Sequence, residues 1–173
     1  MSPPSVESLI DKLTEALKPF FPAVQAPEQQ PVIVGIETGG CWVAEAIHDA
    51  IRPATPLGRL NISFYRDDFT RVGLQPTVKP SSLPADIDDR TIILVDDVLY
   101  SGRTVRAAMN EIFDYGRPRR ILLAILIDRG EREIPIQADF VGERMQLQRG
   151  QHIKLEGPSP LRLSLKQMDD DER

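Results

Sequence analysis

Two neighbouring aspartates in the middle of the chain are the residues best suited to chemistry. Asp96 and Asp97 follow the apolar run that begins at Ile92. A carboxylate at the end of a buried strand adds little to packing, but it accepts hydrogen bonds from vicinal hydroxyls or holds a hydrated divalent cation. Ligands of open α/β sheets bind at the carboxyl ends of the strands, so this pair predicts a ligand site.

The residues that follow the aspartates are suited to binding an anion. Ser101 and Thr104 carry hydroxyls, Arg103 carries a guanidinium, and Gly102 allows a close approach of the backbone. A helix that begins near Arg103 would add the partial positive charge of its N-terminus. Carboxylates for a ribose, followed within a few residues by an anion cradle, predict a site for a ribose 5-phosphate.

Residues 92–104 also allow two other interpretations. The aspartates could simply end a strand while Ser101 caps a helix, although the whole string favours a ligand site. A nucleotide triphosphatase also has an apolar strand that ends in acidic residues, but it requires a G-x-x-x-x-G-K-[ST] loop. Gly35, Gly39 and Gly40 stand without the lysine of such a loop, so we set this class aside.

Alternating strands and helices would position these residues. Apolar residues at helical spacing predict helices over residues 5–18, about 43–51 and about 103–116. Short apolar runs predict strands over residues 31–36, 60–64, 91–95, 120–127, 138–141 and 152–155. This order indicates an α/β fold with a mostly parallel sheet and helices on both faces. The polar tail from Lys166 is expected to fray.

Size and composition bound the class of protein. The chain has 173 residues, 41% of them hydrophobic and 27% charged, as expected for one soluble globular domain. We expect no membrane span and no signal peptide. The single cysteine, Cys41, excludes an internal disulfide and suits a reducing cytoplasm. A net charge of −5 argues against indiscriminate nucleic-acid binding but allows a local basic face.

Several strings carry a resemblance to a known family. IILVDDVLYSGRTVRAA, from Ile92, resembles the motif with which type I phosphoribosyltransferases bind 5-phosphoribosyl pyrophosphate (PRPP). That string resembles most closely the family of pyrimidine operon regulators and uracil phosphoribosyltransferases (PyrR). Other strings agree with this family, namely VGIETGG (34–40), SFYRDD (63–68), DYGRPRRILLAILIDRG (114–130) and EREIPIQADFVG (131–142). The resemblance runs from about residue 32 to about residue 156.

The resemblance implies a fold and a reaction. The fold would be the type I phosphoribosyltransferase fold in a single domain, residues 1–173. A flexible lid would span about residues 67–89, and a small hood would comprise the chain from about residue 130 plus the N-terminal segment. Residues 67–89 also lack periodicity, as functional loops often do. The reaction would transfer phosphoribose from PRPP to N1 of uracil, giving UMP and diphosphate, with Mg²⁺ bound through PRPP rather than by a firm protein ligand.

The family's motifs also assign roles to individual residues. The catalytic residues would be Asp96, Asp97, Arg66 and Asp67. The PRPP-binding residues would be Asp96, Asp97, Val98, Leu99, Tyr100, Ser101, Gly102, Arg103 and Thr104. The pyrophosphate loop would be Thr38, Gly39 and Gly40. The base-binding residues would be Asp128, Arg129 and Gly130. Because this chemistry needs no protein nucleophile, the enzyme would mainly position the reactants and stabilise charge.

The pyrophosphate loop departs from the family's pattern. Active members carry a basic residue after the loop threonine, where this chain is assigned Gly40, and an often basic position is Glu37. Losing a cation and gaining an anion should weaken pyrophosphate binding, so low transferase turnover is expected. The alternatives are a nucleotide-sensing regulator without significant catalysis and a phosphoribosyltransferase for another base. The YRDD and IDRG strings argue against a purine base.

The resemblance implies a second, regulatory function. The family binds the leader mRNA of pyrimidine genes and responds to UMP and PRPP. An RNA site needs basic side chains that follow phosphates, and the candidates are Lys12, Arg144, Arg149 and Lys154. The family also implies a homodimer or a higher homo-oligomer.

Overall fold

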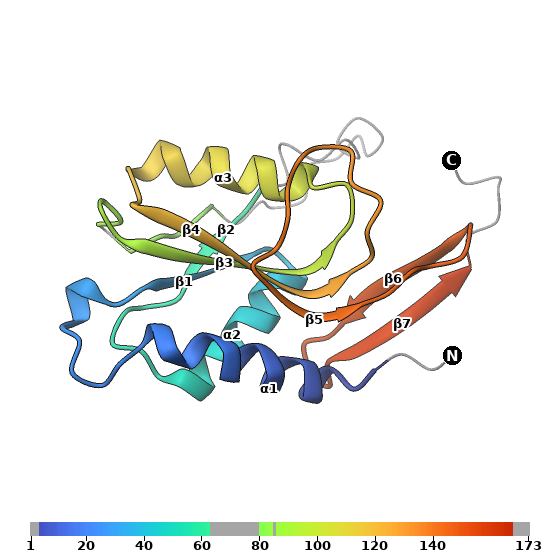
Figure 1. The fold of residues 1–173 in the computed structure, drawn as a ribbon, viewed down its shortest axis with the longest axis horizontal. Coiled ribbons are helices and arrows are strands. Elements are labelled where there is room, and N and C mark those ends of the chain that lie inside the picture. Colours follow the sequence, from blue (N-terminus) through green and yellow to red (C-terminus); the bar gives the residue numbers. More distant parts are fainter. Residues whose placement is uncertain (1–3, 63–79, 85, 168–173) are drawn as a thin grey trace.

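A parallel sheet of five strands forms the centre of the molecule (Figure 1). The computed structural model describes residues 4–62, 80–84 and 86–167, and the strand order is β2-β1-β3-β4-β5. The bounds are Val32–Ile36 for β1, Gly58–Leu60 for β2, Thr91–Leu99 for β3, Arg120–Asp128 for β4 and Phe140–Arg144 for β5. Every pair of neighbouring strands in this sheet is parallel, as the sequence predicts.

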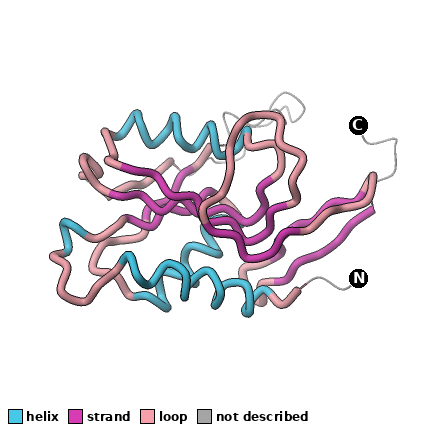
Figure 2. The backbone as a smooth tube through the Cα atoms, in the orientation of Figure 1, coloured by secondary structure: helices cyan, strands magenta, loops and turns pink. Residues whose placement is uncertain are grey.

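In the described part of the chain, three α-helices cover the two faces of the sheet (Figures 1 and 2). α3 (Arg103–Tyr115) lies on one face, while α1 (Val6–Leu17) and α2 (Gly39–Ile51) lie on the other. The Ser5 hydroxyl caps α1, because it accepts a hydrogen bond of 3.5 Å from the N–H of Ser8. Among the described residues, no helix combines the length and the apolar character that a membrane crossing requires.

The sheet separates two apolar cores. Successive side chains of a strand point to opposite faces. Ile33 and Ile93 therefore pack with α1 and α2, whereas Val34 and Leu94 pack with α3. All five residues of β1 are buried. Central strands covered on both faces are apolar without alternation, and this is why the sequence predicts them as buried strands.

The described boundaries correct three predicted strands. The strand predicted at residues 60–64 is found at Gly58–Leu60, and residues 63–64 lie outside the described part. The strand predicted to end at residue 95 continues to Leu99, because Asp96, Val98 and Leu99 still pair with β4. The strand predicted at residues 138–141 is found later, at Phe140–Arg144.

A hairpin of two antiparallel strands extends away from the main sheet (Figure 1). It consists of β6 (Gln151–Glu156) and β7 (Arg162–Gln167). The sequence predicts β6 but not β7, and the prediction that the chain frays from Lys166 is wrong for Lys166 and Gln167, which lie in β7. The hairpin has one apolar side, where Ile153, Leu155 and Leu163 join the core beside α1.

Candidate functional site

The aspartate pair lies inside β3, near its carboxyl end. Asp96 is paired with Ile125 of β4, and the ladder continues to Leu99. The loop that the sequence predicts from residue 98 is therefore shorter and begins at Tyr100. Asp96 is only 4% exposed, and its Oδ1 accepts a 3.0 Å hydrogen bond from the N–H of Asp97. Asp97 is half-buried, so it is the more accessible of the two carboxylates.

The glycine turn between β1 and α2 lies directly against this pair. A methyl group on Gly39 would collide with the Asp97 carboxylate, at 2.6 Å from its Cγ. A methyl group on Gly40 would lie 2.7 Å from the carbonyl oxygen of Val95 and 3.0 Å from the Cα of Asp96. The turn contains a cis peptide between Glu37 and Thr38. The structure thus brings the predicted pyrophosphate loop and the aspartate pair into contact.

The charges around this turn are partly compensated. Arg59, on β2, has its Nη1 3.7 Å from the Glu37 carboxylate and forms a closer ion pair with Glu45 of α2. The residue directly after Thr38 is Gly39. The basic residue of the family's pattern is therefore replaced by Gly39, and not by Gly40 as predicted from the sequence. The Glu37 charge, which the sequence presents as unopposed, has a cationic neighbour.

Cys41 lies under the turn and is inert. Its side chain is buried, and the thiol donates a hydrogen bond of 3.3 Å to the carbonyl of Gly35. Burial and the neighbouring Glu37 carboxylate raise the pKa of this thiol to about 12. The Cys41 side chain therefore stays protonated near neutral pH and acts as a packing group.

The predicted anion cradle forms the turn from β3 into α3. Gly102 immediately precedes the first residue of α3. Its φ of 92° is a conformation that favours glycine. The Ser101 hydroxyl accepts a 3.3 Å hydrogen bond from the N–H of Arg103, and Thr104 is half-buried in the first turn. The Arg103 guanidinium pairs with Glu133 at 2.5 Å. Hydroxyls, N–H groups and the helix N-terminus thus meet at one place suited to a phosphate.

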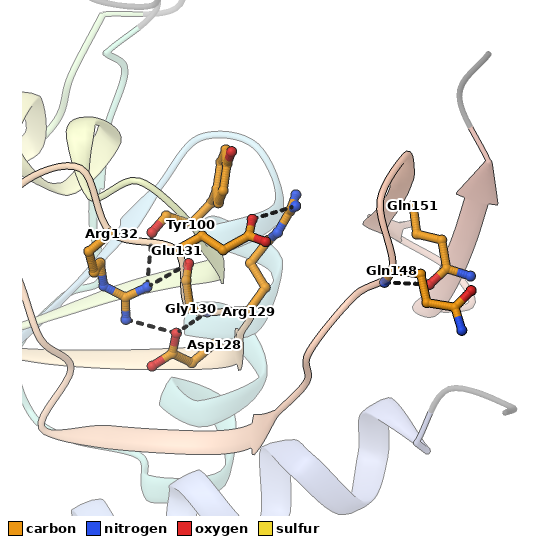
Figure 3. A network of polar contacts seen from close by, with 8 residues as sticks. All are labelled: Tyr100, Asp128, Arg129, Gly130, Glu131, Arg132, Gln148 and Gln151. Carbon is orange, nitrogen blue, oxygen red and sulfur yellow. Dashed lines mark hydrogen bonds and ion pairs between the residues drawn. The ribbon is translucent and has the colours of Figure 1, made fainter. Parts of the chain in front are cut away.

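The predicted base-binding residues follow β4, beside the end of β3. The N–H of Arg129 donates to the carbonyl of Leu99 at 3.0 Å, and the N–H of Gly130 donates to Asp128 Oδ1 at 3.0 Å. The Arg129 guanidinium lies over the Tyr100 ring, 4.0 Å from its centroid. Figure 3 shows these groups close together. The described site residues from three loops therefore lie at the carboxyl ends of β1, β3 and β4.

Sequence reasoning missed Arg132 (Figure 3). Its guanidinium donates to the Tyr100 carbonyl, after β3, and to the Asp128 carboxylate, at the end of β4. The string EREIPI gave no reason to single out this arginine, because its partners come from distant parts of the chain. Arg66, Asp67 and most of the expected lid, residues 67–89, lie outside the described residues.

The RNA-binding candidates lie on α1, on β5 and β6 and between these two strands, and Arg144 is the sheet partner of Asp128. Arg144 ends β5, Lys154 lies in β6, and Arg149 lies between these strands; all three are exposed. The Lys12 amine, on α1, donates a 2.5 Å hydrogen bond to the carbonyl of Gly142 in β5. Lys12 is therefore close to β5, where its charge is partly committed to the backbone.

Comparison with known proteins identifies the class first. The model of the phosphoribosyl transferase domain matches residues 6–151. A hypoxanthine-guanine phosphoribosyltransferase from Bacillus anthracis superposes with a TM-score of 0.62 at 17% identity, covering 84% of each chain. A purine phosphoribosyltransferase from Pyrococcus horikoshii gives a TM-score of 0.59 at 24% identity, covering 82% of this chain and 83% of that one. The predicted type I phosphoribosyltransferase fold is confirmed.

Sequence relatives then identify the family. A protein named "Bifunctional protein PyrR" from Nitrosococcus oceani is 56% identical over 142 residues, which is 81% of this chain and 80% of the relative. One with the same name from Pseudomonas paraeruginosa is 49% identical over 166 residues, 96% of each chain. The chain belongs to the PyrR family, as its motifs predict.

Proposed function

We propose that this protein transfers phosphoribose from PRPP to uracil, giving UMP and diphosphate, and that it also regulates pyrimidine biosynthetic genes. One observation carries the catalytic part. The glycine turn at Gly39 and Gly40 packs against Asp96 and Asp97, next to the anion cradle that begins at Ser101. Relatives at 49–56% identity are named bifunctional, which supports two functions in one chain.

The phosphoribose would bind across the end of β3. Asp97, the more accessible carboxylate, would accept hydrogen bonds from the ribose hydroxyls. Asp96, which is buried and accepts the N–H of Asp97, would hold the backbone in position. The hydroxyls of Ser101 and Thr104 and the N–H groups at the start of α3 would bind the 5-phosphate. No side chain has to act as a nucleophile, because positioning and charge stabilisation are sufficient for this displacement.

The diphosphate would lie over the turn at Thr38, Gly39 and Gly40. The backbone N–H groups at the start of α2 would donate to it. Carboxylate oxygens of the kind that Asp96 and Asp97 supply are ligands that Mg²⁺ accepts, and the described residues contain no group of three or more His, Cys, Asp or Glu side chains that could hold a metal by themselves. Mg²⁺ bound together with PRPP would supply positive charge that stabilises the diphosphate. Turnover should be low, because the turn has no cationic side chain.

The base would be read by the backbone of Asp128, Arg129 and Gly130. The Arg129 side chain already lies over Tyr100 and pairs with Glu131 at 3.2 Å, and the N–H groups of Arg129 and Gly130 already donate to Leu99 and Asp128. The carbonyl oxygens of the loop, each of which can accept two hydrogen bonds, would therefore read the base. A pyrimidine presents a donor and acceptor pattern that backbone groups can match.

A steady-state assay tests the catalytic proposal. Protein, Mg²⁺ and PRPP are incubated with uracil, hypoxanthine or guanine, and nucleotide formation is followed. UMP should form and the purine nucleotides should not. Absence of UMP together with absence of PRPP binding in calorimetry would overturn the proposal. PRPP and UMP binding without product would instead support the regulator without significant catalysis, which the missing cation of the glycine turn favours.

The regulatory proposal rests on the basic residues beside β5 and β6. Arg144, Arg149 and Lys154 are exposed within a short stretch of chain, and Lys12 lies close to β5. They would follow the phosphates of a leader transcript. A mobility-shift titration with the protein's own pyrimidine leader RNA, with and without UMP, tests this. Binding that does not respond to UMP, or no binding, would refute the regulatory mechanism.

A further inference from the structure

The Arg132 guanidinium donates hydrogen bonds to four residues, of which Figure 3 shows Tyr100, Asp128 and Gly130. Its Nε donates to the carbonyl of Ile136 at 2.8 Å, and its Nη1 donates to the carbonyls of Tyr100 and Gly130 at 2.9 and 3.2 Å. Its Nη2 pairs with Asp128 Oδ1 at 2.7 Å. All three nitrogens of the guanidinium are used, in a planar arrangement that only arginine can supply.

These bonds join two parts of the site. Tyr100 directly precedes the anion cradle, while Asp128 and Gly130 belong to the loop proposed to read the base. The side chains of Arg132 and Asp128 are 22% and 10% exposed, so water and salt screen their ion pair only weakly. The guanidinium therefore fixes the position of the base loop relative to the cradle.

Packing alone does not hold the middle of the base loop. Gly130 has a φ of 74°, and a Cβ placed there would meet no described atom within 4 Å. Further along, the N–H groups of Glu133 and Ile134 donate to the carbonyl of Ser101 at 3.0 and 3.3 Å, but these bonds anchor the chain beyond the loop. Hydrogen bonds therefore hold Gly130: its N–H donates to Asp128 Oδ1, and Arg132 binds both its carbonyl and the same Asp128 oxygen.

We infer that Arg132 is a positioning residue for base recognition: it holds the loop of Asp128, Arg129 and Gly130 where its carbonyl groups can contact a pyrimidine ring. This inference rests on the proposed function, because it takes the base to bind at that loop. The anion cradle is also held by β3, by α3 and by the N–H groups of Glu133 and Ile134 on the Ser101 carbonyl, so ribose phosphate binding should depend on Arg132 less than base binding does.

Comparing two ligands separates the base from the ribose phosphate. UMP and ribose 5-phosphate share the phosphoribose, and only UMP carries the base. Binding of each is measured by calorimetry for the wild type, Arg132→Lys and Arg132→Gln. Lysine keeps the charge beside Asp128 but loses the planar set of donors. The matched control is Arg162→Gln, at an exposed arginine of β7. Thermal melts show which variants are folded.

We expect the preference of the wild type for UMP over ribose 5-phosphate to fall about tenfold in Arg132→Lys and further in Arg132→Gln. Affinity for ribose 5-phosphate should change less than about twofold, and Arg162→Gln should match the wild type. An unchanged preference in folded Arg132→Lys would overturn the inference, as would an equal loss of both ligands. A wild type without any preference for UMP would instead refute the proposed base site. Should Arg132→Gln not fold, Arg132→Lys decides the question.

Discussion

Alanine substitutions at the two glycines of the turn should have different effects, one on stability and one on PRPP binding, although the residues are neighbours. In Gly40→Ala, the new methyl meets backbone atoms, the Val95 carbonyl oxygen at 2.7 Å and the Asp96 Cα at 3.0 Å. In Gly39→Ala, it meets the side chain of Asp97, with Cγ at 2.6 Å. Backbone in a central strand cannot retreat, whereas a half-buried side chain can rotate.

The magnitudes follow from these contacts. Overpacking against fixed atoms lowers the free energy of unfolding by about 1–3 kcal/mol. Alanine in place of glycine in a helix raises it by up to about 1 kcal/mol. Gly40→Ala should therefore lose about 1–2 kcal/mol, which for a chain of this length lowers Tm by roughly 3–6 °C. Gly39→Ala should keep the wild-type Tm within about 2 °C but displace Asp97, and PRPP affinity should fall roughly tenfold or more, since hydrogen bonds to charged groups contribute about 1.5–3 kcal/mol.

Thermal melts and calorimetric PRPP titrations measure both effects. Ala50→Gly is the matched control, because Ala50 is an exposed residue of the same helix and reports the glycine–alanine difference there. Wild-type stability in Gly40→Ala, or wild-type PRPP affinity in Gly39→Ala, would show that the turn does not pack on the aspartates and would refute this description of the site.

Three further predictions concern single groups. Asp97→Asn should weaken PRPP binding roughly tenfold or more with a stability change below about 0.5 kcal/mol; unchanged binding would remove Asp97 from the ribose site. The pKa of Cys41 is raised in the folded state to about 12, so its stabilising effect is full below pH 9 and is lost as pH rises toward 12. Chemical denaturation should accordingly show a steeper fall in stability over this range for the wild type than for Cys41→Ala, and equal slopes would contradict the buried thiol. Arg149→Gln combined with Lys154→Gln should reduce the salt dependence of leader-RNA binding by about two counterions, measured by mobility shift; an unchanged slope would place the RNA elsewhere.

The sequence was sufficient to predict the elements whose burial is uniform. The apolar runs of β1, β3 and β4 and the stripes of α1 and α3 follow directly from being covered on one or both faces. The turn from β3 into α3 was also predictable, because a glycine before a helical stripe is suited to a tight turn. Gly102 does have a positive φ at the helix start. These features depend on local residues and on a single partner surface.

Features that depend on distant partners were not predictable. β3 extends through Asp96 and Asp97 because β4 continues to pair with it, although two acidic residues suggest the end of a strand. β7 was not predicted, because Pro158 and Pro160 precede it and its last residues are polar. The network around Arg132 joins residues 100, 128, 130 and 136, and no local pattern reports such a meeting.

The charge balance at the glycine turn connects the structure to the expected low turnover. Arg59 offsets Glu37, but the same guanidinium also faces Glu45, so one cation serves two carboxylates and the group keeps a net negative charge. Arg59 therefore reduces the penalty of Glu37 without making the turn attractive to a diphosphate. The opposing charge has to come from backbone N–H groups at the start of α2 and from Mg²⁺ that accompanies PRPP. The residues proposed to bind the 5-phosphate, by contrast, lie together at the start of α3, so we expect PRPP binding to be less impaired than turnover.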